Sequence, residues 1–147
     1  MKKIFSFAVA LIACALAFTS CDPKIDSPLV GGWLINGTLT IVDPSTGTST
    51  TYDAEHSINF FDNGQYQYNI YIKNTFDGIY YRGTWSVKEN QVTIRTQKYG
   101  PIKDNTFYVD SSFQPKEEVA TWEIKDHYLY LTYSVGRKVH FYVGSGL

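Results

Sequence analysis

From Val30 onward the chain consists of short runs rich in Tyr, Thr, Ile, Val and Trp, separated at short intervals by Gly, Asn and Asp. Residues of the first kind favour strands, and residues of the second kind favour the tight turns that connect strands. No stretch between residues 30 and 147 keeps the 3.6-residue apolar period of an amphipathic helix. The pattern therefore predicts an antiparallel all-β domain with little helix.

The turns also predict which strand residues face one another, because a slip of one residue would turn every side chain to the opposite face of the sheet. A three-residue loop at 62–64, ending in Gly64, places Phe60 opposite Tyr66 and Ile58 opposite Tyr68. The same construction predicts these further pairs on one apolar face: Ile72 with Ile79, Ile70 with Tyr81, Tyr66 with Trp85, Val87 with Val92, Trp85 with Ile94, Ile124 with Leu129, Trp122 with Leu131, Tyr133 with Val139 and Leu131 with Phe141. The first hairpin, around residues 44–48, also fits this face if Trp33 meets Ile58 and Leu39 meets Tyr52.

Strands that share one apolar face must close into a barrel or stack as a sandwich. Because the hairpins follow one another in order, we expect an antiparallel up-and-down β-barrel of eight or nine strands over residues 30–147, and a sandwich is the alternative. The segment 99–118 is long for a hairpin connection. It either adds a short strand at 106–109, with Phe113 capping a barrel end, or forms a lid over the mouth of the barrel.

The first 20 residues have the layout of an export signal. Lys2 and Lys3 precede an apolar run from Ile4 to Phe18, which is about 15 residues long and therefore shorter than the roughly 20 needed for a membrane-spanning helix. Thr19 and Ser20 then precede Cys21, as in the site that bacterial lipoprotein signal peptidase recognises. We expect residues 1–20 to be a signal peptide and Cys21 to be the lipidation site.

After cleavage Cys21 is the last cysteine left, because Cys14 leaves with the signal. An unpaired thiol is a liability in an oxidising compartment, and acylation removes it. Residues 21–29 read as a lipidated tether with two prolines and mixed charge. We expect a protein of the bacterial cell envelope that is bound to a membrane through its N-terminal lipid. The outer membrane is the favoured location, and the sequence allows either its periplasmic or its surface face.

Charge and motif content argue against several function classes. Removing Lys2 and Lys3 from the 13 basic residues leaves 11 against 14 acidic ones, so there is no basic field for nucleic acid. His56, His127 and His140 fall in different hairpins, on the core face, in a turn and on the outer face respectively. No nucleotide-binding, hydrolase or metal-ligand motif is present in the sequence. We expect no enzyme, no cofactor and no metal.

Gly31-Gly32-Trp33, at the start of the first expected strand, resembles the G-x-W opening of lipocalins. The later features FFDNGQY and GTWSV add a strand, a D-N-G turn and a second G-x-W. Over residues 29–147 the chain resembles the lipocalin-like lipoproteins of Bacteroides-type bacteria. The resemblance implies a calycin-type barrel.

Two binding surfaces follow from the expected strand faces. The barrel interior offers an apolar cup with tyrosine hydroxyls for a small apolar or amphipathic ligand, unless these rings only fill the core. Its candidate ligand-binding residues are Trp33, Phe60, Tyr66, Tyr68, Tyr81, Trp85, Trp122, Tyr133 and Phe141. The outer face offers a row of tyrosines for a protein-interaction or inhibitor module, unless tyrosine is there as a favoured strand residue. This row comprises Tyr71, Tyr80, Tyr128, Tyr130 and Tyr142.

Overall fold

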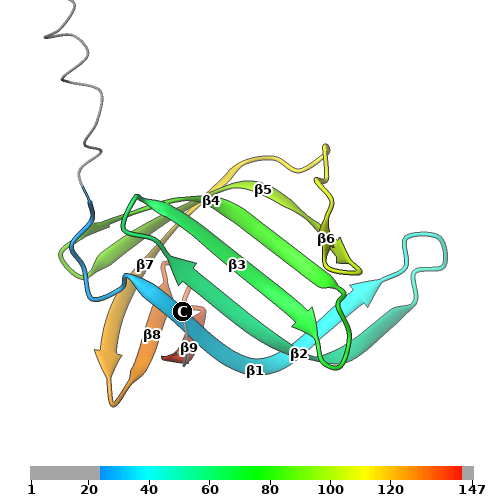
Figure 1. Cartoon of the computed structure of the whole chain (residues 1–147), viewed down its shortest axis with the longest axis horizontal. Coiled ribbons are helices and arrows are strands. Elements are labelled where there is room, and N and C mark those ends of the chain that lie inside the picture. The colour runs from blue at the N-terminus through cyan, green and yellow to red at the C-terminus, as the bar shows by residue number, and fades with distance from the viewer. Residues whose placement is uncertain (1–23, 144–147) are drawn as a thin grey trace, which may run out of the picture.

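A computed structural model describes residues 24–143 as nine strands, with no helix in that range (Figure 1). The expected signal peptide 1–20 and Cys21 lie outside the described residues. Residues 24–143 thus offer no helix long and apolar enough to cross a membrane. The strands are β1 (Gly31–Val42), β2 (Ser49–Phe60), β3 (Gln65–Ile72), β4 (Gly78–Lys88), β5 (Gln91–Lys103), β6 (Thr106–Phe107), β7 (Lys116–Lys125), β8 (Tyr128–Tyr133) and β9 (Lys138–Val143).

The strands form one antiparallel sheet in the order β4-β3-β2-β1-β9-β8-β7-β5-β6. An additional pairing between β4 and β5 joins the two sides of this sheet, so that all strands except β6 surround a common interior. Strands that follow one another in sequence pair with one another, apart from β6 and β7: both pair with β5. The expected antiparallel up-and-down β-barrel is therefore confirmed, and the sandwich is not formed.

Most of the predicted strand registers are also confirmed. Trp33 faces Ile58 and Leu39 faces Tyr52 between β1 and β2. The predicted pairs between β2 and β3, β4 and β5, and β7 and β8 are likewise present. In the last three of these hairpins the turn residues were sufficient to place the strands, whereas the β1–β2 register was expected from the match of apolar faces.

The predicted register between β3 and β4 is wrong by two residues. Ile70 rather than Ile72 faces Ile79, Tyr68 rather than Ile70 faces Tyr81, and Tyr66 faces Gly83 instead of Trp85. The Thr75 hydroxyl donates to the Ile72 carbonyl at 2.9 Å and accepts a hydrogen bond from the Asp77 amide at 3.1 Å. These side-chain bonds close the turn one residue earlier than expected. A shift of two keeps every side chain on its predicted face.

The predicted register between β8 and β9 is wrong by the same amount. Leu131 rather than Tyr133 faces Val139, and Leu129 rather than Leu131 faces Phe141. The turn comprises residues 134–136 and ends at Gly136, which has a left-handed φ of 82°. Because glycine adopts this conformation without a steric penalty, it takes the last position of the loop, as Gly64 does in the 62–64 turn.

One end of the barrel is closed by packed side chains. Leu29 is fully buried there, and its carbonyl accepts a hydrogen bond from the indole Nε1 of Trp33 at 3.0 Å. The rings of Phe60 and Trp85 pack together with centroids 5.0 Å apart. The backbone amide of Ile25 donates to the Asp62 carbonyl at 2.7 Å, which fixes the N-terminal segment against this end.

The other end is open because the strands differ in length. β1 has 12 residues and β5 has 13, whereas β8 and β9 have six each. Within residues 24–143, β9 pairs with β1 only at Trp33 and Leu34, and β7 pairs with β5 only as far as Thr96. Beyond these points the wall formed by β7, β8 and β9 ends, while β1 to β5 continue as a curved sheet.

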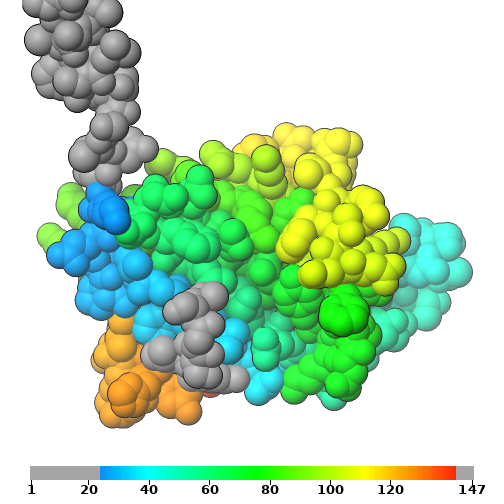
Figure 2. Space-filling view, viewed as in Figure 1, coloured from blue at the N-terminus to red at the C-terminus, as the bar shows by residue number. Residues whose placement is uncertain are grey.

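The segment that follows β5 forms an added strand along the edge of this sheet. Asp104 and Asn105 both have positive φ in a two-residue turn, after which Phe107 faces Ile102 in the pairing with β6. The amides of Tyr108 and Asp110 then donate to carbonyls of β5. Figures 1 and 2 show this segment in yellow at the same end of the molecule as the cyan tip of the β1–β2 hairpin.

Candidate functional site

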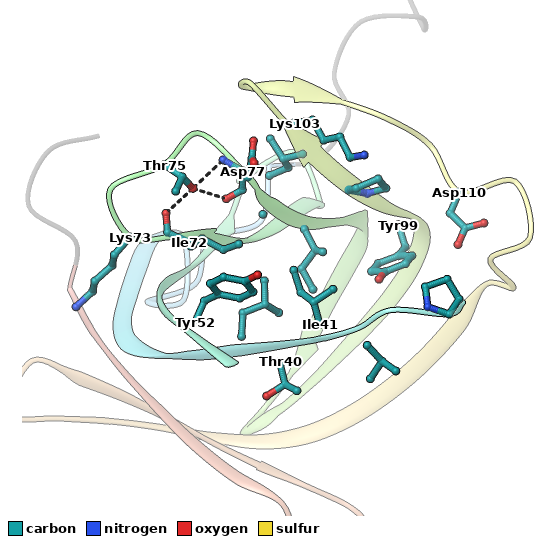
Figure 3. Close-up of a pocket in the computed structure, with 17 residues that line it drawn as sticks. Thr40, Ile41, Tyr52, Ile72, Lys73, Thr75, Asp77, Tyr99, Lys103 and Asp110 are labelled. Carbon is teal, nitrogen blue, oxygen red and sulfur yellow. Dashed lines mark hydrogen bonds between the residues drawn. The ribbon is translucent and has the colours of Figure 1, made fainter. Parts of the chain in front are cut away.

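A groove of about 1050 Å³ occupies the open end of the barrel. It lies between the far half of β1 and the far half of β5, where the short strands no longer form a wall. Inward-facing residues of β1 to β5 give it an apolar surface, since alternate residues of a strand share one face. Its apolar lining includes Leu39, Ile41, Tyr52, Ile72, Ile79 and Tyr99 (Figure 3).

Polar side chains surround the mouth of the groove. Lys73 and Asp77 line it on the side of the β3–β4 turn, and Lys103 and Asp110 line it near β5 (Figure 3). Two cations and two carboxylates leave this rim without net charge. The apolar surface of the groove is therefore open to water, and the rim produces no net electrostatic field that would select a ligand by its charge.

The floor of the groove is a small packed cluster. Leu39, Ala54 and Ile70 are buried in it, and Ile79 and Tyr81 pack against them. This cluster is separate from the larger one at the closed end of the barrel. The groove thus has a fixed apolar base, and its side walls remain accessible to a ligand.

An inner cavity of about 150 Å³ lies deeper in the barrel. The Tyr66 hydroxyl is hydrogen-bonded to the Thr96 hydroxyl, and the Tyr68 hydroxyl lies 2.7 Å from His56 Nδ1. The hydroxyls of Tyr81 and Tyr133 make no hydrogen bond within residues 24–141. Burial raises the pKa of Tyr66 to about 12 and also raises the pKa of the other three tyrosines, so all four hydroxyls stay protonated near neutral pH.

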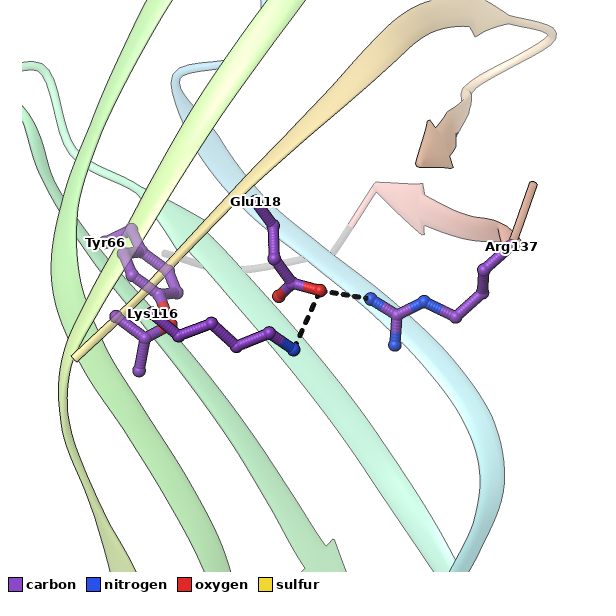
Figure 4. Close-up of polar contacts among 5 residues, drawn as sticks. Tyr66, Lys116, Glu118 and Arg137 are labelled. Atoms are coloured by element: carbon purple, nitrogen blue, oxygen red, sulfur yellow. Dashed lines mark hydrogen bonds and ion pairs between the residues drawn. The ribbon is translucent and has the colours of Figure 1, made fainter. Parts of the chain in front are cut away.

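Three charged side chains line the outer part of the inner cavity. Glu118 Oε1 lies 3.1 Å from Lys116 Nζ and 3.3 Å from Arg137 Nη2 (Figure 4). The Arg137 guanidinium also lies over the Tyr133 ring, 4.1 Å from its centroid. These side chains stand where β7 and β9 begin and β8 ends. They therefore mark the rim of the short wall, next to the groove.

His56 is half-buried on the inner face of β2, as expected. Its Nε2 must donate to the Thr38 carbonyl, at 3.1 Å, because a carbonyl oxygen only accepts hydrogen bonds. In the neutral ring Nδ1 then accepts from the Tyr68 hydroxyl. Burial lowers the pKa of His56 from its ordinary value near 6.5.

This lowered pKa makes stability depend on pH. The unfolded chain binds a proton at His56 from about pH 6.5 downward, whereas the folded protein binds it only at lower pH. The stabilising effect of neutral His56 is therefore present above pH 6.5 and is lost as the pH falls through the folded pKa. We expect the unfolding free energy, measured by urea denaturation, to fall less between pH 7 and pH 5 in His56→Gln than in the parent protein. His127→Asn, a change in an exposed turn, should keep the full loss; equal slopes in both variants would contradict this assignment.

The structure divides the nine candidate ligand-binding residues into two groups. All nine belong to or pack against the main core, but Trp33, Phe60, Trp85 and the partly buried Trp122 line neither the groove nor the inner cavity. The inner cavity is lined by the other five, which are Tyr66, Tyr68, Tyr81, Tyr133 and Phe141. None of the nine lines the groove. The sequence did not identify the groove residues as ligand-binding candidates, because their accessibility depends on how far β7, β8 and β9 extend. Their alternation along β1 and β2 was nevertheless visible in the sequence.

The expected outer tyrosine row is not continuous. Tyr80 is only 3% exposed because the Phe107 ring covers it at a centroid distance of 5.2 Å, so the expectation of an exposed Tyr80 is wrong. Tyr71 is partly buried, and the side chain of Tyr142 lies outside the described residues. Tyr128 and Tyr130 are exposed beside His140.

Within residues 24–143 no group of three His, Cys, Asp or Glu side chains is placed to hold a metal ion. His127 lies in the β7–β8 turn and His140 is exposed on β9, as expected from the sequence.

No protein-family model matches the chain, and no curated protein matches it.

Proposed function

We propose that the protein is a non-catalytic, lipocalin-like binding protein that holds a small apolar or amphipathic molecule in the groove. The observation that carries this proposal is the size and lining of the groove, about 1050 Å³ with Leu39, Ile41 and Ile79 among its walls. Known ligand pockets are of roughly this size, and most of their lining is apolar with a few polar groups. A surface of this kind gains free energy when a ligand removes it from water.

Calorimetric titration of the purified protein with decanol tests this function. We expect binding of one molecule per chain with a negative heat-capacity change, because apolar surface is buried. Decanol is the chosen probe because it has an apolar chain and no charge. The absence of a saturable heat at several temperatures would contradict the proposal.

The second part of the proposal is that Cys21 carries lipid and attaches the protein to a membrane of the bacterial cell envelope, with the outer membrane favoured. It rests on the export signal at 1–20 and on the single remaining cysteine. In a bacterial expression host supplied with an alkyne-labelled fatty acid, we expect the parent protein to carry the label and to sediment with membranes. Cys21→Ser should lose the label and most of its membrane association. The matched variant Cys14→Ser should keep both, and a labelled Cys21→Ser protein would refute the site.

A second candidate function is a protein-interaction module on the outer face of β8 and β9. The exposed rings of Tyr128, Tyr130 and His140 pack together, with centroids between 6.0 and 6.4 Å apart. Tyrosine is enriched where proteins contact one another. This alternative predicts that the groove binds no decanol and that Tyr130→Ala disrupts recognition of a protein partner.

A further inference from the structure

We propose that the ligand of the groove is an extended peptide, which adds a strand to the open edge of β1 and places alternate apolar side chains in the groove. This inference rests on the proposed function of the groove and assigns its ligand to one chemical class, short uncharged peptides with alternating apolar residues. Three features support it: an unpaired stretch of backbone at residues 38–42, the contact of the groove with that backbone, and the way the chain covers the corresponding edge of β5.

The far half of β1 is an edge of the sheet. β2 pairs with all of β1, whereas within residues 24–143 β9 pairs with only two residues near its start. The Asp43 amide donates to the Thr48 carbonyl at 2.9 Å, so these two opposed residues form a hydrogen-bonded pair. Hydrogen-bonded and non-hydrogen-bonded pairs alternate along an antiparallel ladder. The backbone groups of residues 38, 40 and 42 therefore point away from β2, toward the open edge.

Most of these edge groups have no partner among the described residues. The Thr38 carbonyl accepts a hydrogen bond from His56 Nε2 at 3.1 Å, and the histidine ring lies against Gly37, which has no side chain to exclude it. The Thr38 amide and both backbone groups of Thr40 and Val42 form no hydrogen bond within residues 24–141. A row of unpaired amides and carbonyls is the feature that recognises an added strand.

The groove lies against this backbone. Its lining includes Leu39, Thr40, Ile41 and Val42, which are consecutive residues. The side chains of a strand alternate between its two faces, so a space that contacts four residues in a row reaches the edge of the strand as well as one face. Figure 3 shows Ile41 pointing into the groove and Thr40 on the other side of β1. A ligand in the groove therefore meets the open edge.

The chain itself shows how such an edge is covered. Beyond Thr96, where the pairing with β7 stops, β6 and the residues after it run along the edge of β5. The Tyr108 amide donates to the Pro101 carbonyl at 3.0 Å, and the Asp110 amide donates to the Tyr99 carbonyl at 2.8 Å. An extended segment thus covers the edge of β5. The edge of β1 on the other side of the groove has no such segment among the described residues, and an extended peptide supplies the same covering.

The sequence of the edge favours an uncharged strand. Charged residues, proline and bulges are the features by which natural edge strands exclude an added strand. Residues 38–42 contain no charged residue and no proline, and their register with β2 is unbroken. The rim of the groove has no net charge either. The edge spans about 13 Å, four steps of 3.3 Å, which suits a peptide of about five residues.

Antiparallel pairing determines which way each peptide residue points. Residues directly opposite each other in such a pair share one face of the sheet and one hydrogen-bonding direction. Peptide residues opposite Leu39 and Ile41 therefore place their side chains in the groove, and their amides point away from β1. Peptide residues opposite Thr38, Thr40 and Val42 bond to the edge and turn their side chains outward. The site thus selects apolar residues at alternate positions and accepts polar residues between them.

The test is calorimetric titration of the purified protein with the peptide acetyl-Thr-Val-Thr-Val-Thr-amide. We expect saturable binding of one peptide per chain. An analogue N-methylated at its threonines lacks the amide donors that face β1, so its affinity should be at least tenfold lower. An analogue N-methylated at its valines is the matched control. The valine amides point away from β1, so this analogue should keep the affinity of the parent peptide.

Two protein variants test the same edge from the side of β1. Thr40→Pro removes the Thr40 amide and places a ring at the open edge, so peptide affinity should fall at least tenfold. Thr51→Pro is the matched control and should keep the affinity. Thr51 faces Thr40 on β2 and shares its hydroxyl–hydroxyl hydrogen bond, but its amide points away from β1, and β3 pairs with β2 only from Ala54 onward. Circular dichroism verifies that both variants are folded.

The outcomes separate this inference from the proposed function. Equal affinities of the two N-methylated peptides would overturn strand addition at β1. If the protein binds decanol but not the peptide, the peptide assignment is overturned and the groove function stays intact, whereas failure of both ligands would overturn the proposed function as well. Sedimentation velocity of the peptide-free protein tests for a second copy at the edge. We expect a monomer, and a dimer that Thr40→Pro dissociates would overturn the peptide assignment in favour of pairing between two copies of the chain.

Discussion

Replacing Phe60 by alanine is expected to lower the free energy of unfolding by about 3–5 kcal/mol. Phe60 is 1% exposed and packs on Trp85 in the core of the closed end. Truncating the ring removes buried apolar surface and leaves a cavity that close-packed neighbours fill only in part. Urea denaturation followed by circular dichroism measures the change.

The neighbouring residue offers a matched control for this substitution. Phe61 is 37% exposed, so Phe61→Ala makes the same chemical change where little packing is lost. We expect it to cost about 1 kcal/mol or less. Similar losses for Phe60→Ala and Phe61→Ala would show that the closed end is not the packed core described here.

Placing a carboxylate in the groove wall is expected to weaken decanol binding at least tenfold. Ile41 lines the groove and is 41% exposed, so Ile41→Asp removes an apolar contact of about 1.5–3 kcal/mol without disturbing the core. The unfolding free energy should change by about 0.5 kcal/mol or less. The affinity is measured by calorimetric titration with decanol.

Val135→Asp is the control for the groove variant. Val135 is 84% exposed in the turn between β8 and β9 and does not line the groove. It introduces the same charge at an exposed position, and we expect its decanol affinity to equal that of the parent protein. Unchanged binding in Ile41→Asp would place the decanol site elsewhere.

The sequence predicted the faces of the strands better than their exact registers. Gly64 and the Asp126-His127 turn place their hairpins correctly, because the local turn chemistry determines where each loop closes. The β3–β4 turn closes earlier because of two hydrogen bonds made by Thr75. Such bonds depend on side-chain geometry that a residue pattern does not contain. The apolar faces survived both errors because each shift was an even number of residues.

The site was predicted less completely than the fold. Inward alternation correctly placed Tyr66, Tyr68 and Tyr133 in the barrel interior, and these residues line the inner cavity. It did not distinguish them from Trp33 and Trp85, which the N-terminal segment helps to bury at the closed end. Nor did it reveal the groove, since an open end arises from unequal strand lengths and from where pairing stops.

Methyl NMR of isoleucine-labelled protein during a titration with decanol tests the central claim most directly, because it locates the ligand. Ile41, Ile72 and Ile79 line the groove, whereas Ile124 packs against the core of the closed end. We predict saturable shifts of the first three methyl signals and an unchanged Ile124 signal. Shifts confined to other isoleucines, or no saturable shift in any of them, would contradict a ligand-binding groove at the open end of the barrel.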